Sequence, residues 1–209
     1  MTVLPSAAPQ LSKSTRALFA AVQNGSIKDA KKALKDGADV TAQDSAGRTP
    51  MMLAVRKGNA ALAKQLLDAG SNPNAKDDYQ DSPFLHASAT GMTSTVTHFL
   101  ARGADVDATN RVGGNALALA CETGQVGTVR ALLKTDIDVD HVNDLGWTAL
   151  HETIVLGQGT SNYVTIARLL VTHGANPNLK DQTGSNAFEL ASDRQQNQMV
   201  NMLRQVSRY

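Results

Sequence analysis

The side chains that could do chemistry in this chain are one cysteine, five histidines and a short run of aspartates. Cys121 follows Ala120 in an apolar stretch, and no histidine stands near it in a motif that would activate a thiol. A buried structural thiol is therefore expected rather than a nucleophile. The histidines show none of the spacings typical of metal ligands; they are His86, His98, His141, His151 and His173.

Two further segments resemble known ligand loops only in part. Asp136, Asp138 and Asp140 alternate like the start of a calcium loop, but His141 stands where that loop needs glycine and Trp147 where it needs glutamate. The Gly157-Gln158-Gly159 segment lacks the third glycine and the preceding strand of a dinucleotide loop. The sequence thus predicts no catalytic, cofactor-binding or metal-binding residue, and we expect a protein that is not an enzyme.

Composition narrows the class of partner. The chain has 209 residues, with 20 Lys and Arg against 19 Asp and Glu, so neither nucleic acid nor an anionic membrane is an expected partner. Residues 1–10 do not resemble a signal peptide, and no stretch approaches the roughly 20 apolar residues of a membrane helix. A lone cysteine fits a reducing compartment, so we expect a cytoplasmic protein with a flexible lead at residues 1–13.

Several residue types recur every 33 positions, which indicates a repeat protein. Within one unit, Thr49-Pro50 resembles a helix start, with threonine as N-cap and proline at the first helical position. Gly58 would end this helix, and Gly70 would end a second, apolar one. The recurring positions are Gly25, Gly58, Gly91, Gly124 and Gly157, and also Ala21, Ala54, Ala87 and Ala120, with Thr153 next.

These features, together with the tetrad Thr148-Ala149-Leu150-His151 and the ending Gly174-Ala175-Asn176-Pro177-Asn178, resemble ankyrin repeats. Order and size are similar to small free-standing bacterial ankyrin proteins. The resemblance implies an all-α solenoid in which each unit has a turn and two helices, with about six units including two caps. The expected single domain spans residues 14–209, with repeats at about 14–43, 44–76, 77–109, 110–142, 143–180 and 181–209.

The pattern breaks at two informative places. From Thr148 to Asn186 the spacing is 38, and the five extra residues are assigned to a loop at 157–163 between two helices. This loop is either a tolerated surface insertion or an edge of the binding face. Gln80 replaces the turn glycine of the third repeat, so its backbone is mildly strained if that position needs a positive φ.

The resemblance also implies that partners dock on a concave face made of turn tips and the exposed ends of first helices. When this face is carried over repeat by repeat, the exposed residues of the second repeat are basic, those of the third repeat are acidic and those of the fifth repeat are apolar. We expect a binding hot spot around Trp147, unless that ring lies flat on the neighbouring turn. The predicted protein-binding residues are Arg48, Arg56, Lys57, Asp78, Tyr79, Asp81, Arg111, Glu122, Leu145, Trp147, Val155 and Leu156.

Three functions remain open at this point. The leading one is a monomeric, non-catalytic scaffold that binds a partner protein, an expectation that rests partly on the fold. An alternative is a dedicated regulator or inhibitor that occludes one partner enzyme. A third is a ligand-binding protein or enzyme that uses Cys121 or the histidines.

Overall fold

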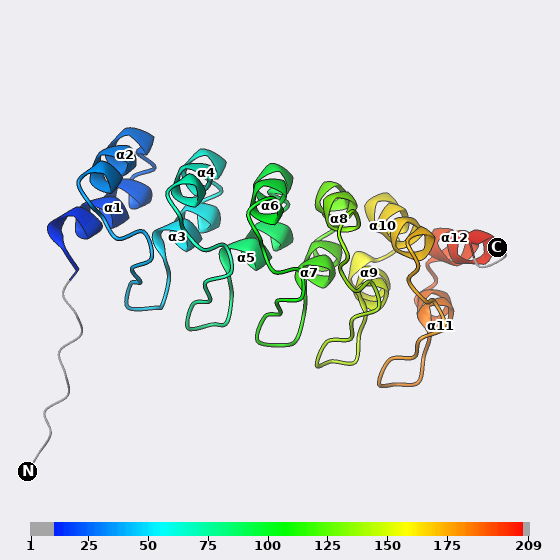
Figure 1. Ribbon diagram of the computed structural model, residues 1–209. Coiled ribbons are helices and arrows are strands. Elements are labelled where there is room, and N and C mark those ends of the chain that lie inside the picture. The colour runs from blue at the N-terminus through cyan, green and yellow to red at the C-terminus, as the bar shows by residue number, and fades with distance from the viewer. Residues whose placement is uncertain (1–10, 207–209) are drawn as a thin grey trace, which may run out of the picture. The chain divides into compact units, whose positions relative to one another are not determined.

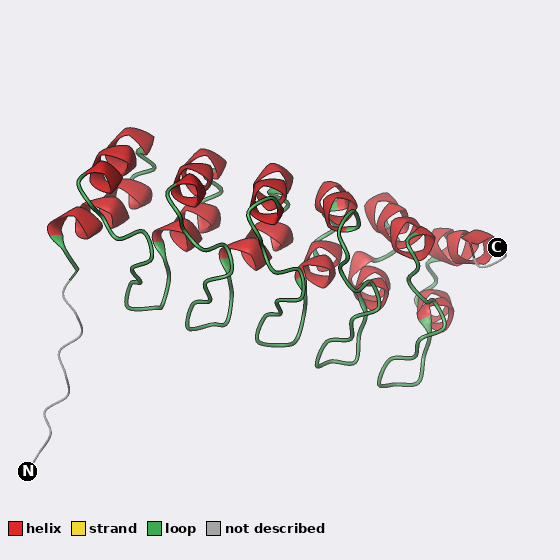
Figure 2. Cartoon of the chain, viewed as in Figure 1, coloured by secondary structure: helices red, strands yellow, loops and turns green. Residues whose placement is uncertain are grey.

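A computed structural model describes residues 11–206 of the chain, and this range consists of helices joined by turns (Figure 2). The helices follow one another in pairs, so the helix pairs predicted from the 33-residue period are confirmed. The expected lead at residues 1–13 falls almost entirely outside the described residues, and the first helix begins at Lys13.

Residues 11–72 form one compact unit, unit 1. Its first helices contact each other, and its second helices contact each other (Figure 1). The core of this unit contains Leu18, Met51, Met52, Leu62 and Leu66, all fully buried. The helices of unit 1 are α1 (Lys13–Gln23), α2 (Ile27–Lys35), α3 (Pro50–Arg56) and α4 (Ala60–Asp68).

Residues 73–206 form the second compact unit, unit 2. The first helix of each pair packs on the next first helix, and the second helices α6, α8, α10 and α12 also pack in series. In Figure 1 the turns of unit 2 project from the side opposite α6 and α8. The helices are α5 (Pro83–Ala89), α6 (Thr93–Leu100), α7 (Ala116–Glu122), α8 (Val126–Leu132), α9 (Ala149–Gly157), α10 (Ser161–Thr172), α11 (Ala187–Asp193) and α12 (Asn197–Val206).

Local chemistry determines where the first helices begin. Thr49 and Ser82 each accept a hydrogen bond from the backbone N–H three residues later, and a proline occupies the first turn behind them. A cap of this kind stabilises a helix by about 1 kcal/mol. Asn115, Thr148 and Asn186 cap the later first helices in the same way.

An aspartate or asparagine side chain holds each turn ahead of these helices. Asp77 Oδ1, for example, accepts hydrogen bonds from the backbone N–H groups of Tyr79 and Asp81 at 2.9 and 3.0 Å. Gln80, between them, has a φ of 60°, so the condition under which the sequence predicts mild strain at this residue is met. This conformation costs a non-glycine residue about 1 kcal/mol.

The prediction that the five extra residues form a loop at 157–163 is wrong. Only residues 158–160 separate α9 from α10, and the extra residues instead lengthen helices: α9 has nine residues where α7 has seven, and α10 has twelve where α8 has seven. The shift arises because Gln158, with a φ of 50°, takes the left-handed C-cap position and Gly157 stays helical.

Gly157 has a packing role that differs from the role of the other glycines in its series. Those at 25, 58, 91 and 124 have φ values near +70°, whereas a Cβ on Gly157 would lie 2.2 Å from the Tyr163 ring. The Tyr163 hydroxyl donates a hydrogen bond to the Glu122 carbonyl at 2.9 Å, which joins α10 to the end of α7. The lengthened α10 is therefore fastened to the repeat before it.

Candidate protein-binding surface

The predicted binding residues of unit 1 differ in their freedom to meet a partner. Arg48 is only partly exposed, and its guanidinium already pairs with Asp44 at 2.8 Å within its own turn. Arg56 and Lys57 are exposed at the end of α3. The structure thus places a local structural contact at Arg48 and solvent-facing charge at the other two.

Three exposed apolar side chains occupy the same turn position in consecutive repeats of unit 2. They are Tyr79, Val112 and Leu145, spaced 33 residues apart, with exposed fractions of 64%, 39% and 50%. We call these three residues the turn-tip row. The backbone N–H of Asp144 donates to the Val112 carbonyl at 3.0 Å, so two adjacent tips are hydrogen-bonded together.

A groove of about 240 Å³ runs beside the start of this row. It brings together the predicted residues Tyr79, Asp81 and Arg111, which come from two adjacent turns. Sequence analysis missed its other five lining residues, which are Leu85, His86, Ala89, Asn110 and Leu119. His86 and Leu119 among them stand four places after the helix N-caps Ser82 and Asn115. Asp78 is exposed near the groove, while Asp81 forms a 3.1 Å contact with the His86 ring.

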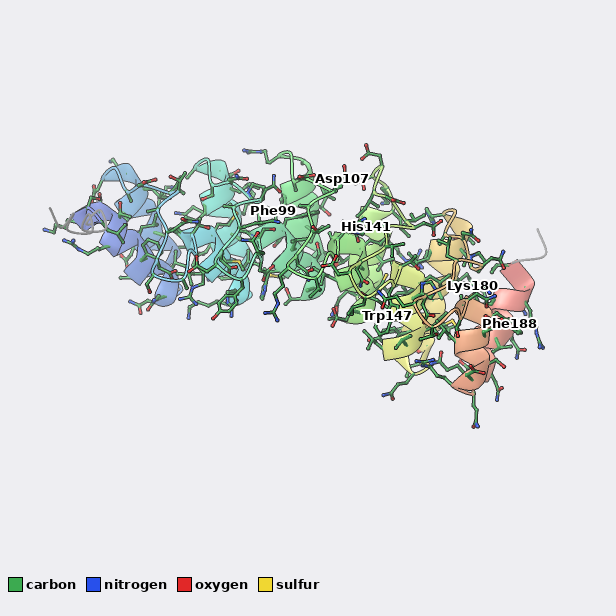
Figure 3. The ribbon with its side chains drawn as sticks, turned by 90° about the horizontal axis from the view of Figure 1, so that it is seen from below. Phe99, Asp107, His141, Trp147, Lys180 and Phe188 are labelled. Carbon is green, nitrogen blue, oxygen red and sulfur yellow. The ribbon has the colours of Figure 1, made fainter. Side chains whose placement is uncertain are left out.

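The apolar group of the fifth repeat is divided between exposed and half-buried residues. Leu145 and Leu156 are exposed, whereas Trp147 and Val155 are partly buried. Trp147 directly precedes the N-cap of α9 and is labelled in Figure 3. The alternative of a half-exposed tryptophan therefore describes this ring better than a fully projecting one, and Leu145 is exposed to the larger fraction of its own surface.

Beneath this surface lies a carboxyl group that sequence analysis did not single out. Glu152 on α9 is 6% exposed, and its Oε1 accepts a 2.7 Å hydrogen bond from Asn143 Nδ2. Oε2 is buried and has no hydrogen-bond partner among the described residues. Burial, and secondarily the negative charge of Glu122, raise the pKa of Glu152 to about 7. Its position corresponds to His86 and Leu119, which was the available signal.

His151 has a structural role in the turn of its own repeat. Its Nδ1 accepts a hydrogen bond from the backbone N–H of Thr148 at 3.1 Å, and its Nε2 donates to the Leu179 carbonyl at 3.1 Å. Burial lowers the pKa of this imidazole, which favours the neutral ring that such bonding requires. Glu122, the remaining predicted residue, is exposed at the end of α7.

Cys121 is fully buried, and burial raises the pKa of its thiol well above the ordinary range. We expect the native protein to resist thiol-reactive dyes at neutral pH, because the thiolate is the reactive form. The measurement is dye release from native and from urea-unfolded protein. Rapid labelling of the native state would contradict this expectation and would revive a chemical role for Cys121.

The described residues hold no group of three or more side chains suited to a metal ion, and none of their helices is long and apolar enough to cross a membrane. A model of ankyrin repeats in three copies matches residues 5–77 and 84–181. The chain belongs to the ankyrin repeat family. Its fold is the expected all-helical ankyrin solenoid of about six helix pairs. No functionally curated protein matches it.

Solved structures support the same assignment. The chain is 43% identical to an ankyrin repeat domain from Acinetobacter baumannii AYE, with a TM-score of 0.87, 91% of this chain and 97% of that one covered. The chain is 34% identical to the ankyrin repeat protein EF0377, with a TM-score of 0.89; the match covers 93% of this chain and 99% of that one. A third similar structure, from Bdellovibrio bacteriovorus, contains the immunity protein Bd3460 in complex with the predatory endopeptidase Bd0816. The identity is 25% and the TM-score 0.77, and the match covers 94% of this chain and 99% of that one.

Proposed function

We propose that this chain is a non-catalytic interaction module that binds a partner protein through the turn-tip row and the neighbouring ends of first helices. Ankyrin repeats generally mediate protein binding. The observation that carries the proposal is the distribution of exposed apolar side chains. Of the six large ones among the described residues, Ile27 lies on α2, and the others lie in the turns of unit 2 or at the end of α9.

Grouped apolar exposure of this kind is typical of protein interfaces. Leu145 and Leu156 would supply apolar anchors, and the edges of Trp147 and Val155 would add area to them. Charged residues around these anchors would orient the partner and speed its association. In this proposal those charges are Asp78, Arg111 and Glu122 of unit 2.

The test is affinity capture from the native cell with the double variant Leu145→Ser/Leu156→Ser. Loss of most of the captured partner is expected, because anchor side chains each contribute about 1–2 kcal/mol or more to an interface. Ile27→Ser is the matched control, since it removes the one exposed large apolar residue of α2. Equal capture by a folded double variant and by wild type would contradict the proposed surface.

A second candidate function is dedicated inhibition of one partner enzyme. It is favoured by the likeness to an immunity protein that is found in complex with an endopeptidase. Inhibition would require no chemistry from this chain, because a protein that covers an active site excludes substrate. Capture of one enzyme in equal amount, and loss of its activity when the pure chain is added, would favour this function over a general scaffold.

A further inference from the structure

Charge is segregated between the two layers of helices in unit 2. None of the first helices α5, α7, α9 and α11 contains lysine or arginine, and the last three of them contain acidic residues. The second helices α6, α8, α10 and α12 contain Arg130, Arg168 and Arg204 and no acidic residue. The second helices of unit 1 instead carry both signs. The charge on the second helices of unit 2 is therefore purely cationic.

The repeats themselves provide an internal comparison. Lys64 on α4 forms a 2.6 Å ion pair with Asp68, four residues later. Two repeats further on, the corresponding residues are Arg130 and Lys134, so attraction has been replaced by repulsion between like charges. The helix dipole favours cations near a helix C-terminus, but it acts equally on α4, where an aspartate stands. Local helix stability thus does not account for the exchange.

These cations border a groove between α8 and α10. Arg130 and Lys134 line it from one side, and Leu169 and His173 from the other, around a volume of about 250 Å³. We call these four residues the outer groove. The ion pairs found within residues 11–206 involve none of its cations, nor Arg168, which follows Arg130 in the next repeat. His173 Nδ1 contacts the Leu169 carbonyl at 2.8 Å, which fixes the ring at the groove edge.

We propose that the outer groove is a second docking site, which takes an extended, acidic protein segment with two carboxylates about three residues apart. Packed helices lie about 8–10 Å apart, and three residues of extended chain span about 10 Å. One carboxylate can therefore meet Arg130 and Lys134 while the next meets Arg168 on α10. Leu169, which is partly exposed and lines the same groove, receives an apolar side chain of the segment.

An anionic membrane is the competing occupant, and the surface does not favour it. Peripheral membrane binding combines electrostatic attraction with apolar side chains that enter the lipid. Among the described residues, none of the exposed large apolar side chains lies on α6, α8, α10 or α12. A cationic groove with a recessed leucine fits a protein segment better than it fits lipid.

The probe is a short fluorescein-labelled peptide with two glutamates three positions apart and a leucine between them, measured by anisotropy. The affinity is expected to fall with added salt and to weaken about tenfold in Arg130→Ala/Lys134→Ala. Lys28→Ala/Lys35→Ala, which changes the charge equally on α2, should bind like wild type. Lys134→Asp, which restores the opposite-charge arrangement of α4, should fold normally and also lose binding.

Three results would overturn the proposal. The first is equal affinity of the outer-groove variant and the α2 control. The second is equal binding of a peptide with glutamine in place of glutamate. The third is stronger binding to phosphatidylserine vesicles than to the peptide, since that result would identify a membrane surface as the occupant.

Discussion

Glu152→Gln is expected to make the free energy of unfolding much less dependent on pH between about 4.5 and 7. The pKa of Glu152 is raised from 4.5 to about 7, so the folded state holds this proton more tightly than the unfolded chain does. The stability of the wild type therefore falls as pH rises through this window and levels off above it. The loss amounts to at most about 3 kcal/mol, and glutamine, which does not ionise, avoids it.

The measurement is urea unfolding of both proteins at pH 5 and at pH 8. Near pH 5 the two should differ little, and at pH 8 the variant should be the more stable. Glu122→Gln is the control, since Glu122 is the second cause of the raised pKa and should produce a smaller change in the same direction. If the free energies of unfolding of wild type and of Glu152→Gln depended on pH in the same way, ionisation of Glu152 would not destabilise the folded state.

Features decided by neighbouring residues could be predicted from the sequence. The caps at Thr49 and Ser82, the following prolines and the left-handed Gln80 depend on the few residues around them. The period then repeats this local information down the chain, which is why the helix pairs were correctly placed. Fold prediction was reliable here because each ankyrin unit is specified by its own short sequence.

Features decided by contacts between repeats could not be predicted in this way. The side chain of Glu152 is buried and accepts a hydrogen bond from Asn143, whereas its sequence position alone shows a polar residue in a first helical turn. Trp147 and Leu145 are both turn residues, but the position before the N-cap is partly buried and the turn tip is exposed. Tyr79 and Leu145 of the turn-tip row were predicted from the sequence, whereas the outer groove could be recognised only after the helix bounds were known.

The five extra residues of the fifth repeat illustrate the same limit. Spacing located them correctly between Thr148 and Asn186, but it could not show that they lengthen α9 and α10. Gly157 fits the 33-residue series perfectly, although its neighbour Gln158 is the residue that adopts the left-handed conformation. The 33-residue period therefore identified Gly157 correctly. The reason for glycine at this position is the close approach of Tyr163, and not a left-handed backbone.

Gly157→Ala provides the direct test of that reason. Alanine is about 1 kcal/mol better than glycine inside a helix, so an uncrowded site would be stabilised by the change. At Gly157 the added methyl group would lie 2.2 Å from the Tyr163 ring, and destabilisation by about 1–3 kcal/mol is expected instead. Urea unfolding measures the sign directly.

Gly58→Ala separates this clash from backbone strain. Gly58 has a φ of +68°, and an added methyl group there would meet no neighbouring atom within 4 Å, so its substitution reports the left-handed penalty alone. In the second step, Tyr163→Ala is combined with Gly157→Ala. If the ring is the cause, the double variant is more stable than the sum of the two single changes predicts. Strict additivity would contradict the contact. A positive coupling would show that the Tyr163 side chain occupies the space that a Cβ on residue 157 would need, because the three nearest atoms all belong to it.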